Sequence, residues 1–310
     1  MTTRFEMCTS VLDDNDLDIL SRTLQEQSFV FVPRAIMLRL LTHNNNTLTQ
    51  DVIEDFHQSW DTAVPQRSTA NDEEVYPFKS TLVTYHNICA SYSARTSTHD
   101  YNKGCHSVLG QCVFEEVDNT TSTQGKAAAT FGRLHRAWPQ NVDDNIIQKS
   151  LHKVIFDLLD TLHVTPTEHP EVVWECMQSA FRVTKSKERH GEPGPEGVHQ
   201  DACVLTAIVL MDRTNVAYDT GGNRVWSLQQ KSGKPTQDDL LSNKLLQEIV
   251  LRDQFDALFV LDRQVKHEAL PIEIEENDND GGVAIRDVVT FEVRVGTRGT
   301  TCTVCSSTDL

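Results

Sequence analysis

The residues best suited to chemistry are a histidine and an aspartate separated by one residue, His199 and Asp201. They follow a Gly- and Pro-rich loop, residues 191–197, and precede an apolar run that predicts a strand. Positions i and i+2 of a strand face the same side, so this spacing predicts that an imidazole and a carboxylate point together toward one metal ion. His267 is the expected third ligand, because it ends a second strand-like segment, residues 255–265.

Two imidazoles and one carboxylate on one face of a metal are the ligand set of non-haem Fe(II) oxygenases. A His-x-Asp spacing alone is weak evidence, because a chain with 12 His residues produces one by chance. The position of His199 at a strand entrance, and of His267 at a strand end, favours a metal site over a solvated surface pair. Arg286 opens the last long strand-like segment, and a guanidinium there could donate two parallel hydrogen bonds to the distal carboxylate of 2-oxoglutarate.

Four segments together resemble the 2-oxoglutarate/Fe(II) dioxygenase family of the bacterial L-isoleucine dioxygenase. The segments are Pro-Glu-Gly-Val-His199-Gln-Asp201, Thr220-Gly-Gly-Asn223, Val265-Lys-His267-Glu-Ala-Leu-Pro271 and Ile285-Arg286-Asp287-Val-Val. The resemblance covers residues 172–295 and implies a double-stranded β-helix, a cupin-like jelly roll that is mainly β with flanking helices.

The same resemblance implies a ligand set and two cosubstrates. Fe(II) would be bound by His199, Asp201 and His267, with 2-oxoglutarate and O2 as cosubstrates. Arg286 would bind the 2-oxoglutarate carboxylate, and Arg182 would contact the cosubstrate or the substrate. The chain departs from the family at Ala202, and in a long acidic insertion at residues 273–282. The N-terminal half is also larger than compact bacterial members need, which indicates a substrate other than isoleucine.

The elements that must position these residues follow from hydrophobic periodicity. Apolar residues at three- and four-residue spacing predict helices, while runs rich in Val, Ile, Thr and Phe predict strands. The predicted helices span residues 13–24, 51–60 and 142–162, and the predicted strands span residues 29–32, 172–183, 199–211, 223–228, 255–265 and 283–295. We expect one dioxygenase domain over residues 1–310, with a helix-rich part (1–170), a β-helix core (171–298) and a tail (299–310).

Charge and composition exclude some partners. The chain has 28 Lys and Arg residues against 45 Asp and Glu residues, a formal charge of −17, which disfavours nucleic acid and anionic membranes as partners. The first residues lack the basic-then-apolar layout of a secretory signal, and eight cysteines are too sparse for a disulfide scaffold at this length. A cytoplasmic location is therefore expected.

The predicted reaction is oxidation of an unactivated C–H bond in a small amino acid or an amino-acid-derived molecule, with hydroxylation as the default outcome. Such a zwitterion could be held by Arg182 or Arg294 together with an acid. Oxidative ring closure, as in kainoid biosynthesis, and desaturation use the same ligands and stay open. Two alternatives from other classes are a non-catalytic jelly-roll binding protein and a zinc hydrolase with the same triad.

Overall fold

The computed structural model describes two thirds of the chain, including all of the segments that resemble a dioxygenase except a few loop positions. The described residues are 16–43, 49–63, 81–92, 108–114, 132–136, 146–162, 172–187, 191, 193, 197–201, 203–275 and 282–297. The tail expected at residues 299–310 lies outside this description.

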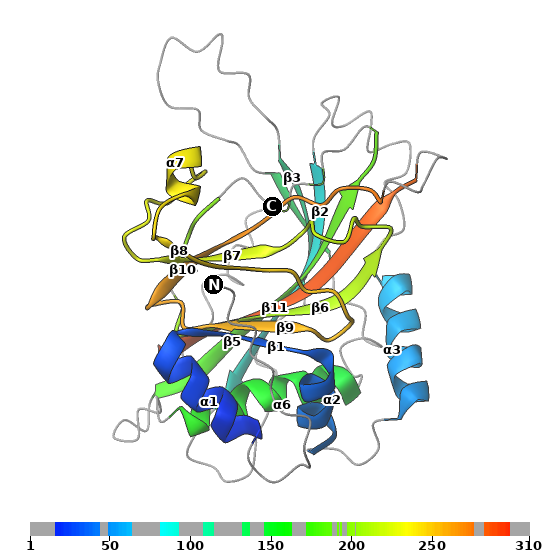
Figure 1. Cartoon of the computed structure of the whole chain (residues 1–310). Coiled ribbons are helices and arrows are strands. Elements are labelled where there is room, and N and C mark those ends of the chain that lie inside the picture. The colour runs from blue at the N-terminus through cyan, green and yellow to red at the C-terminus, as the bar shows by residue number, and fades with distance from the viewer. Residues whose placement is uncertain are drawn as a thin grey trace.

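The strands form two antiparallel sheets (Figure 1). The eight-stranded sheet has the order β1-β9-β6-β11-β5-β2-β3-β4, and the three-stranded sheet has the order β10-β7-β8. The larger sheet contains β1 (Phe29–Val32), β2 (Thr81–Tyr92), β3 (Val108–Phe114), β4 (Gly132–Arg136), β5 (Val172–Lys185), β6 (Leu205–Thr214), β9 (Ala257–Val260) and β11 (Ala284–Thr297). The smaller sheet contains β7 (Asn223–Ser227), β8 (Leu245–Ile249) and β10 (Val265–Ala269).

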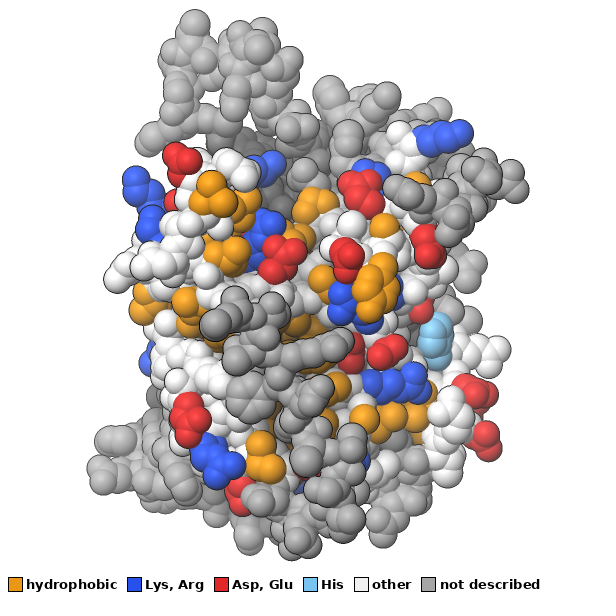
Figure 2. Space-filling model, in the orientation of Figure 1, with side chains coloured by type: hydrophobic (Ala, Val, Ile, Leu, Met, Phe, Trp, Pro, Cys, Tyr) orange, Lys and Arg blue, Asp and Glu red, His pale blue; other side chains and the backbone are white. Residues whose placement is uncertain are grey.

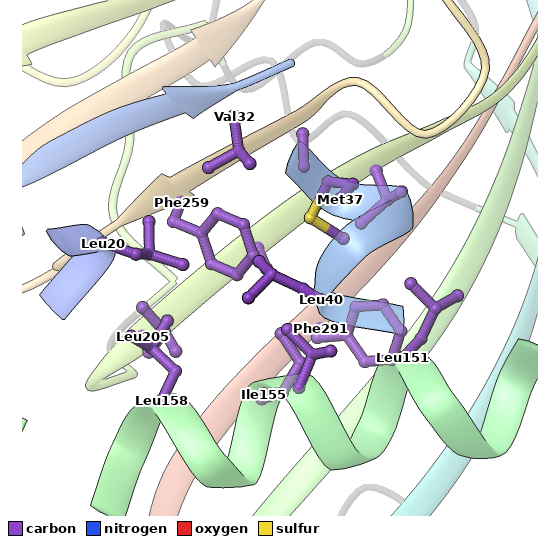
Figure 3. Packing of buried hydrophobic residues seen from close by; sticks show 14 of the residues in the cluster. Leu20, Val32, Met37, Leu40, Leu151, Ile155, Leu158, Leu205, Phe259 and Phe291 are labelled. Atoms are coloured by element: carbon purple, nitrogen blue, oxygen red, sulfur yellow. The ribbon is translucent and has the colours of Figure 1, made fainter. Parts of the chain in front are cut away.

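Helices cover one face of the larger sheet (Figure 1). They are α1 (Asp16–Gln27), α2 (Arg34–His43), α3 (Gln50–Ala63) and α6 (Ile146–Thr161), and a short helix, α7 (Gln237–Leu240), lies beside the smaller sheet. Leu20 of α1, Met37 and Leu40 of α2, and Leu151, Ile155 and Leu158 of α6 pack against Leu205, Phe259 and Phe291 of the strands (Figure 3). This apolar cluster includes the periodic apolar residues of α1 and α6 from which those helices were predicted. It buries the outer face of the larger sheet.

A second apolar cluster lies between the two sheets. It joins Ile208, Leu210, Leu258, Val260 and Val288 of the larger sheet to Val225, Ile249 and Val265 of the smaller one. The central strand β11 therefore alternates between two environments. Its odd-numbered residues from Val289 to Val293 pack under the helices, and its even-numbered residues from Arg286 to Arg294 face the space between the sheets. Two facing antiparallel sheets with helices on the outside are the mainly β jelly roll that was expected.

Three expectations about the elements need correction. The first half of the chain is not only helical, because β2, β3 and β4 extend the larger sheet beyond β5. The strand expected at 255–265 is two strands, β9 and β10, separated by a turn at residues 261–264. His267 therefore lies in the middle of β10 rather than at a strand end. The described elements α2, α7 and β8 were not predicted, and the other predicted elements agree with the structure to within a few residues at each end, except that β6 begins only at Leu205.

The surface seen in Figure 2 carries Lys and Arg side chains interspersed with Asp and Glu side chains among the described residues. Of the helices that the structure describes, none has the length and apolar character needed to cross a bilayer.

Candidate active site

Backbone pairing holds His199 and His267 side by side. The N–H of His199 donates to the carbonyl of His267 at 2.9 Å, and the N–H of His267 donates back at 3.0 Å. Two residues that exchange both hydrogen bonds stand directly opposite each other in an antiparallel pair, so their side chains share a face. The two imidazole rings accordingly lie 4.5 Å apart, centroid to centroid.

Asp201 completes the cluster from the loop that follows His199. Its Oδ1 lies 3.4 Å from His199 Nε2 and its Oδ2 lies 3.1 Å from His267 Nε2. The candidate ligand atoms of the three residues all lie within 4.8 Å of one another. The structure thus brings the three residues together, but not by strand alternation as predicted. His199 forms an isolated bridge and β6 begins only at Leu205, so an irregular loop carries Asp201 to the site.

The neighbours of the cluster orient its nitrogen and oxygen atoms. His199 Nδ1 lies 2.8 Å from the carbonyl of Gly197, which can only accept, so Nδ1 carries a proton and Nε2 is the nitrogen directed at Asp201. The hydroxyl of Thr206 donates to Asp201 Oδ2 at 3.1 Å. His267 Nε2 is buried, and it lies 3.1 Å from Asp201 Oδ2 and 3.3 Å from Asp262 Oδ1. Two imidazole nitrogens and a carboxylate fit a borderline divalent metal such as Fe(II).

Burial and mutual contact shift the titration of the three groups in the metal-free protein. Burial alone lowers the pKa of His267, but contacts with Asp201 and Asp262 outweigh it and raise that pKa to about 9. Burial also opposes the charged form of His199, yet the hydrogen bond to Asp201 raises its pKa. Burial raises the pKa of Asp201, and hydrogen bonds from both histidines reverse this effect, so that its pKa is lowered. Protons on the two imidazoles therefore balance the Asp201 carboxylate in the metal-free protein, and a bound cation would replace them.

Arg286 lies on the inner face of β11, with 2% of its surface exposed. Its Nε and Nη2 have no hydrogen-bond partner among the described residues. Burial and the neighbouring guanidinium of Arg213 lower the pKa of Arg286 to about 10. A buried guanidinium without an acceptor is costly, so this position fits an anionic ligand that accepts from it.

Arg182 is placed differently. Its guanidinium donates to both carboxylate oxygens of Asp287, at 2.8 Å from Nε to Oδ1, and both side chains are buried. Asp287 is adjacent to Arg286 in β11, so strand alternation puts this ion pair on the outer face, opposite the space between the sheets. The contacts of Arg182 therefore favour a structural role, and we do not propose it as a cosubstrate ligand.

A sequence profile of the 2OG-Fe dioxygenase family matches residues 113–292, more than half of the chain, including the triad and Arg286. This chain belongs to the 2OG-Fe dioxygenase family. Such enzymes use Fe(II), 2-oxoglutarate and O2, so the predicted enzyme class and cofactors are confirmed. The family also agrees with the jelly roll seen in the two facing sheets.

Solved structures similar to this dioxygenase show the same fold over nearly the whole chain. The Fe(II)/α-ketoglutarate-dependent dioxygenase TqaL has a TM-score of 0.61 and 15% identity, with 92% of this chain and 88% of that chain covered. A BsmA homologue from Methylobium petroleophilum PM1 has a TM-score of 0.60 and 14% identity, with 92% and 96% covered. IDO from Bacillus thuringiensis has a TM-score of 0.53 and 13% identity, with 93% and 97% covered. No match was found among curated proteins. At these identities the likeness concerns the fold, and the finer resemblance to isoleucine dioxygenase stays a prediction.

Metal binding by this dioxygenase should depend steeply on pH, because only neutral imidazoles bind Fe(II). The pKa of His267 is raised to about 9 in the metal-free protein, so its protonated form is favoured below that pH and must lose its proton when the metal binds. We expect the apparent affinity to rise roughly tenfold per pH unit up to the pKa of His267. Anaerobic calorimetry of Fe(II) binding in two buffers that differ in protonation enthalpy measures the released proton. Binding at about pH 7 without proton release would contradict the prediction.

Gly221 shapes the pocket around Arg286. It has a φ of +66°, and an added Cβ would lie 2.6 Å from Ile272 Cγ2 and 3.1 Å from Arg286 Cδ. We expect Gly221→Ala to displace the Arg286 side chain and to raise the 2-oxoglutarate concentration at half-saturation by about tenfold, or about 1.4 kcal/mol.

Gly233→Ala is the matched control for this substitution. Gly233 also has a positive φ, +108°, but an added Cβ there meets no atom within 4 Å. The control should show the backbone strain of an L-residue at positive φ without a change in 2-oxoglutarate binding. An equal rise of half-saturation in both variants would mean that backbone strain, rather than contact with Arg286, is responsible.

Cys203 and Asp262 form a second possible ligand group with Asp201. Burial raises the pKa of the Cys203 thiol well above its usual value, which disfavours the thiolate that binds metals. Both carboxylate oxygens of Asp262 already accept backbone N–H groups. The His199–Asp201–His267 set is therefore the better metal site.

Two residues near the triad were not among the predicted site residues. Glu292 lies on the inner face of β11, where burial and the charge of Asp201 raise its pKa to about 7. Asp262 lies in the turn between β9 and β10, 3.3 Å from His267 Nε2. Glu292 looks like an ordinary polar position of an exposed strand face, and Asp262 like an ordinary turn residue. Only the closure of the sheets brings either residue to the site.

Proposed function

We propose that this dioxygenase oxidises an unactivated C–H bond of a small amino acid or an amino-acid-derived molecule, with release of succinate and CO2. His199, Asp201 and His267 hold Fe(II), and Arg286 holds the distal carboxylate of 2-oxoglutarate. The observation that carries this proposal is the buried guanidinium of Arg286, whose Nε and Nη2 lack a partner among the described residues, on an inner face that also presents the triad.

Each of these residues has a defined task. The two imidazoles and the carboxylate bind the metal on one side and leave its other side open for 2-oxoglutarate and O2. Fe(II) with these cosubstrates supplies the oxidising power, and the protein supplies ligands, orientation and a dry pocket. Arg286 fixes the orientation of 2-oxoglutarate, because its guanidinium donates hydrogen bonds in a planar fork and accepts none. The apolar side chains between the sheets, including Val225 and Val288, exclude water from this region.

The polar pair Glu292 and Arg294 supports a zwitterionic substrate. Arg294 Nη2 donates to Glu292 Oε2 at 2.9 Å and to the backbone carbonyl of Asp201 at 3.2 Å, which puts both charges beside the metal ligands. An acid and a base side by side match the ammonium and carboxylate of an amino acid. Hydroxylation is the default outcome, and ring closure or desaturation would use the same residues.

A reducing, cytoplasmic compartment suits the two thiols that the structure describes. Cys176 and Cys203 are both free and buried. Free thiols persist where glutathione and thioredoxin keep cysteines reduced.

The deciding experiment has two stages. Anaerobic addition of Fe(II) and 2-oxoglutarate to the metal-free protein should give a weak metal-to-ligand band in the visible range. A screen of free amino acids and their N-alkylated derivatives, scored by succinate release and by mass spectrometry of the product, then identifies the substrate. A gain of one oxygen indicates hydroxylation, and a loss of two hydrogens indicates ring closure or desaturation.

The alternatives give different results. A non-catalytic jelly roll gives no visible band. A zinc hydrolase turns over without oxygen consumption or succinate release. Turnover of peptides or nucleic acid, with no activity on any amino acid or derivative, would overturn the proposed substrate class.

A further inference from the structure

The strand β9 is followed by a buried aspartate that is not in the ligand set, Asp262, with 0% of its surface exposed. Its Oδ1 accepts the backbone N–H of Asp201 at 3.0 Å, and its Oδ2 accepts the backbone N–H of Cys203 at 3.2 Å. One carboxylate in the β9–β10 turn therefore binds the loop on both sides of the metal ligand Asp201.

Further contacts attach the same loop to the same part of the fold. The side-chain amide of Gln200 donates to the backbone carbonyl of Asp262. His199 and His267 exchange both backbone hydrogen bonds across the bridge. Each described residue from 199 to 203 is thus joined to residues 262–267, and these residues also carry the third ligand.

This attachment matters because the loop has no regular secondary structure to hold it. Fixing the backbone of one residue costs about 1–2 kcal/mol of conformational entropy, and a loop left free would lose that entropy when the metal binds. Groups that orient metal ligands from outside the ligand set commonly contribute 10- to 100-fold to metal affinity. The contacts of Asp262 are of this kind, since they act on the backbone of a ligand rather than on the metal.

We propose that Asp262 is a positioning residue that holds the Asp201 carboxylate in its metal-binding place before the metal arrives. The inference rests on the proposed function, because it assumes that the triad binds Fe(II). Asp262 is not offered as a fourth ligand, since both of its carboxylate oxygens accept N–H groups of the loop.

The chain offers a matched control at the other end of β9. Asp256 is also buried, with 4% of its surface exposed. Its Oδ1 accepts the N–H of Arg34 at 2.8 Å, and its Oδ2 accepts the N–H groups of Arg252 at 2.8 Å and of Asp253 at 3.0 Å. Asp256 therefore makes the same type of contact as Asp262, but to segments that carry no metal ligand.

The experiment compares Asp262→Asn with Asp256→Asn. An asparagine can accept through one oxygen only, and its amide group faces an N–H donor at the other position, so each variant loses one backbone contact. Mn(II), followed by electron paramagnetic resonance, serves as a redox-stable probe of metal affinity. Hydrogen exchange of the metal-free proteins, read on a peptide containing residues 199–205, reports loop opening without any metal. Thermal unfolding of both variants measures the general cost of the substitution.

We expect Asp262→Asn to lower Mn(II) affinity by about 10- to 100-fold and to speed exchange in the 199–205 peptide. Asp256→Asn should change thermal stability by a similar amount and leave both readouts unchanged. Equal metal affinity in Asp262→Asn and the wild type, or equal losses in the two variants, would overturn the positioning role. Failure of the wild type to bind Mn(II) or Fe(II) would instead overturn the proposed function.

A second variant covers the case in which Asp262→Asn does not fold. Gln200 is exposed, and Gln200→Ala removes only its contact with the Asp262 carbonyl. We expect this variant to have the same melting temperature as the wild type. Its metal affinity should fall by about threefold and hydrogen exchange of the 199–205 peptide should become faster, since one of the loop contacts is lost. Unchanged exchange and unchanged affinity would count against the inference.

Discussion

His267→Ala should remove Fe(II) from the protein while the fold remains. His267 supplies one of three ligand atoms from the middle of β10, and its backbone bridge to His199 does not depend on the side chain. Loss of a direct ligand should lower metal affinity by more than the roughly 100-fold that outer contacts can cost. Metal analysis after desalting gives the occupancy, and circular dichroism checks the fold.

His57→Ala is a suitable control for this substitution. His57 lies on α3 with about a third of its side chain exposed, and its Nε2 is 3.5 Å from Asp212 rather than from any member of the triad. The control should retain full iron occupancy. Full occupancy in His267→Ala as well would exclude the proposed ligand set.

Arg286→Ala should raise the 2-oxoglutarate requirement steeply and change Fe(II) binding little. Removing one partner of a desolvated, hydrogen-bonded charge pair costs about 2–5 kcal/mol. At about 1.4 kcal/mol per tenfold, this corresponds to a loss of roughly 30- to several-thousand-fold in cosubstrate affinity. Arg286→Lys should be intermediate, because a lysine keeps the charge and loses the planar fork. A 2-oxoglutarate titration at saturating Fe(II) measures the effect.

Arg182→Lys separates this effect from the general cost of changing a buried arginine. Arg182 is paired with Asp287 on the outer face, so its substitution should lower thermal stability and leave 2-oxoglutarate half-saturation near the wild-type value. Nε and Nη2 of Arg286 have no partner within the described part of the chain, so removal of this side chain should cost the ligand-free protein little stability. An unchanged half-saturation point in Arg286→Ala would move the anchor to another inner-face arginine, with Arg294 the next residue to test.

The sequence predicted the elements well where one periodic pattern decided the structure. The stripe of α6 and the apolar run of β1 are examples, because local sequence and burial agree there. The division between β9 and β10 was missed, since only three polar residues, Asp262, Arg263 and Gln264, separate the two apolar runs and no Gly or Pro marks the turn. Strands β2 to β4 were missed because polar residues interrupt their apolar runs, as His86 and Asn87 do in β2.

The site was predictable as a set of residue types, and less so as a set of contacts. His199, Asp201 and His267 were predicted from spacing and strand context, and they lie together in the structure, although a loop rather than a regular strand presents Asp201. Arg182 and Arg286 could not be separated by sequence, since both are arginines in apolar strands. Asp287 pairs with Arg182, whereas Nε and Nη2 of Arg286 have no partner among the described residues. This difference depends on which face of the sheet each arginine side chain takes in the neighbouring strands β5 and β11.

The alternation along β11 has a consequence for how this strand tolerates variation. Substitutions at Arg286, Thr290, Glu292 and Arg294 alter groups between the sheets, where polarity and charge matter more than volume. Substitutions at Val289, Phe291 and Val293 alter packing under the helices, where volume matters most. Neighbouring residues of a single strand are therefore under different constraints. We expect substitutions at the even positions to give an abundant but inactive protein. We expect substitutions at the odd positions to lower the amount of folded protein that accumulates.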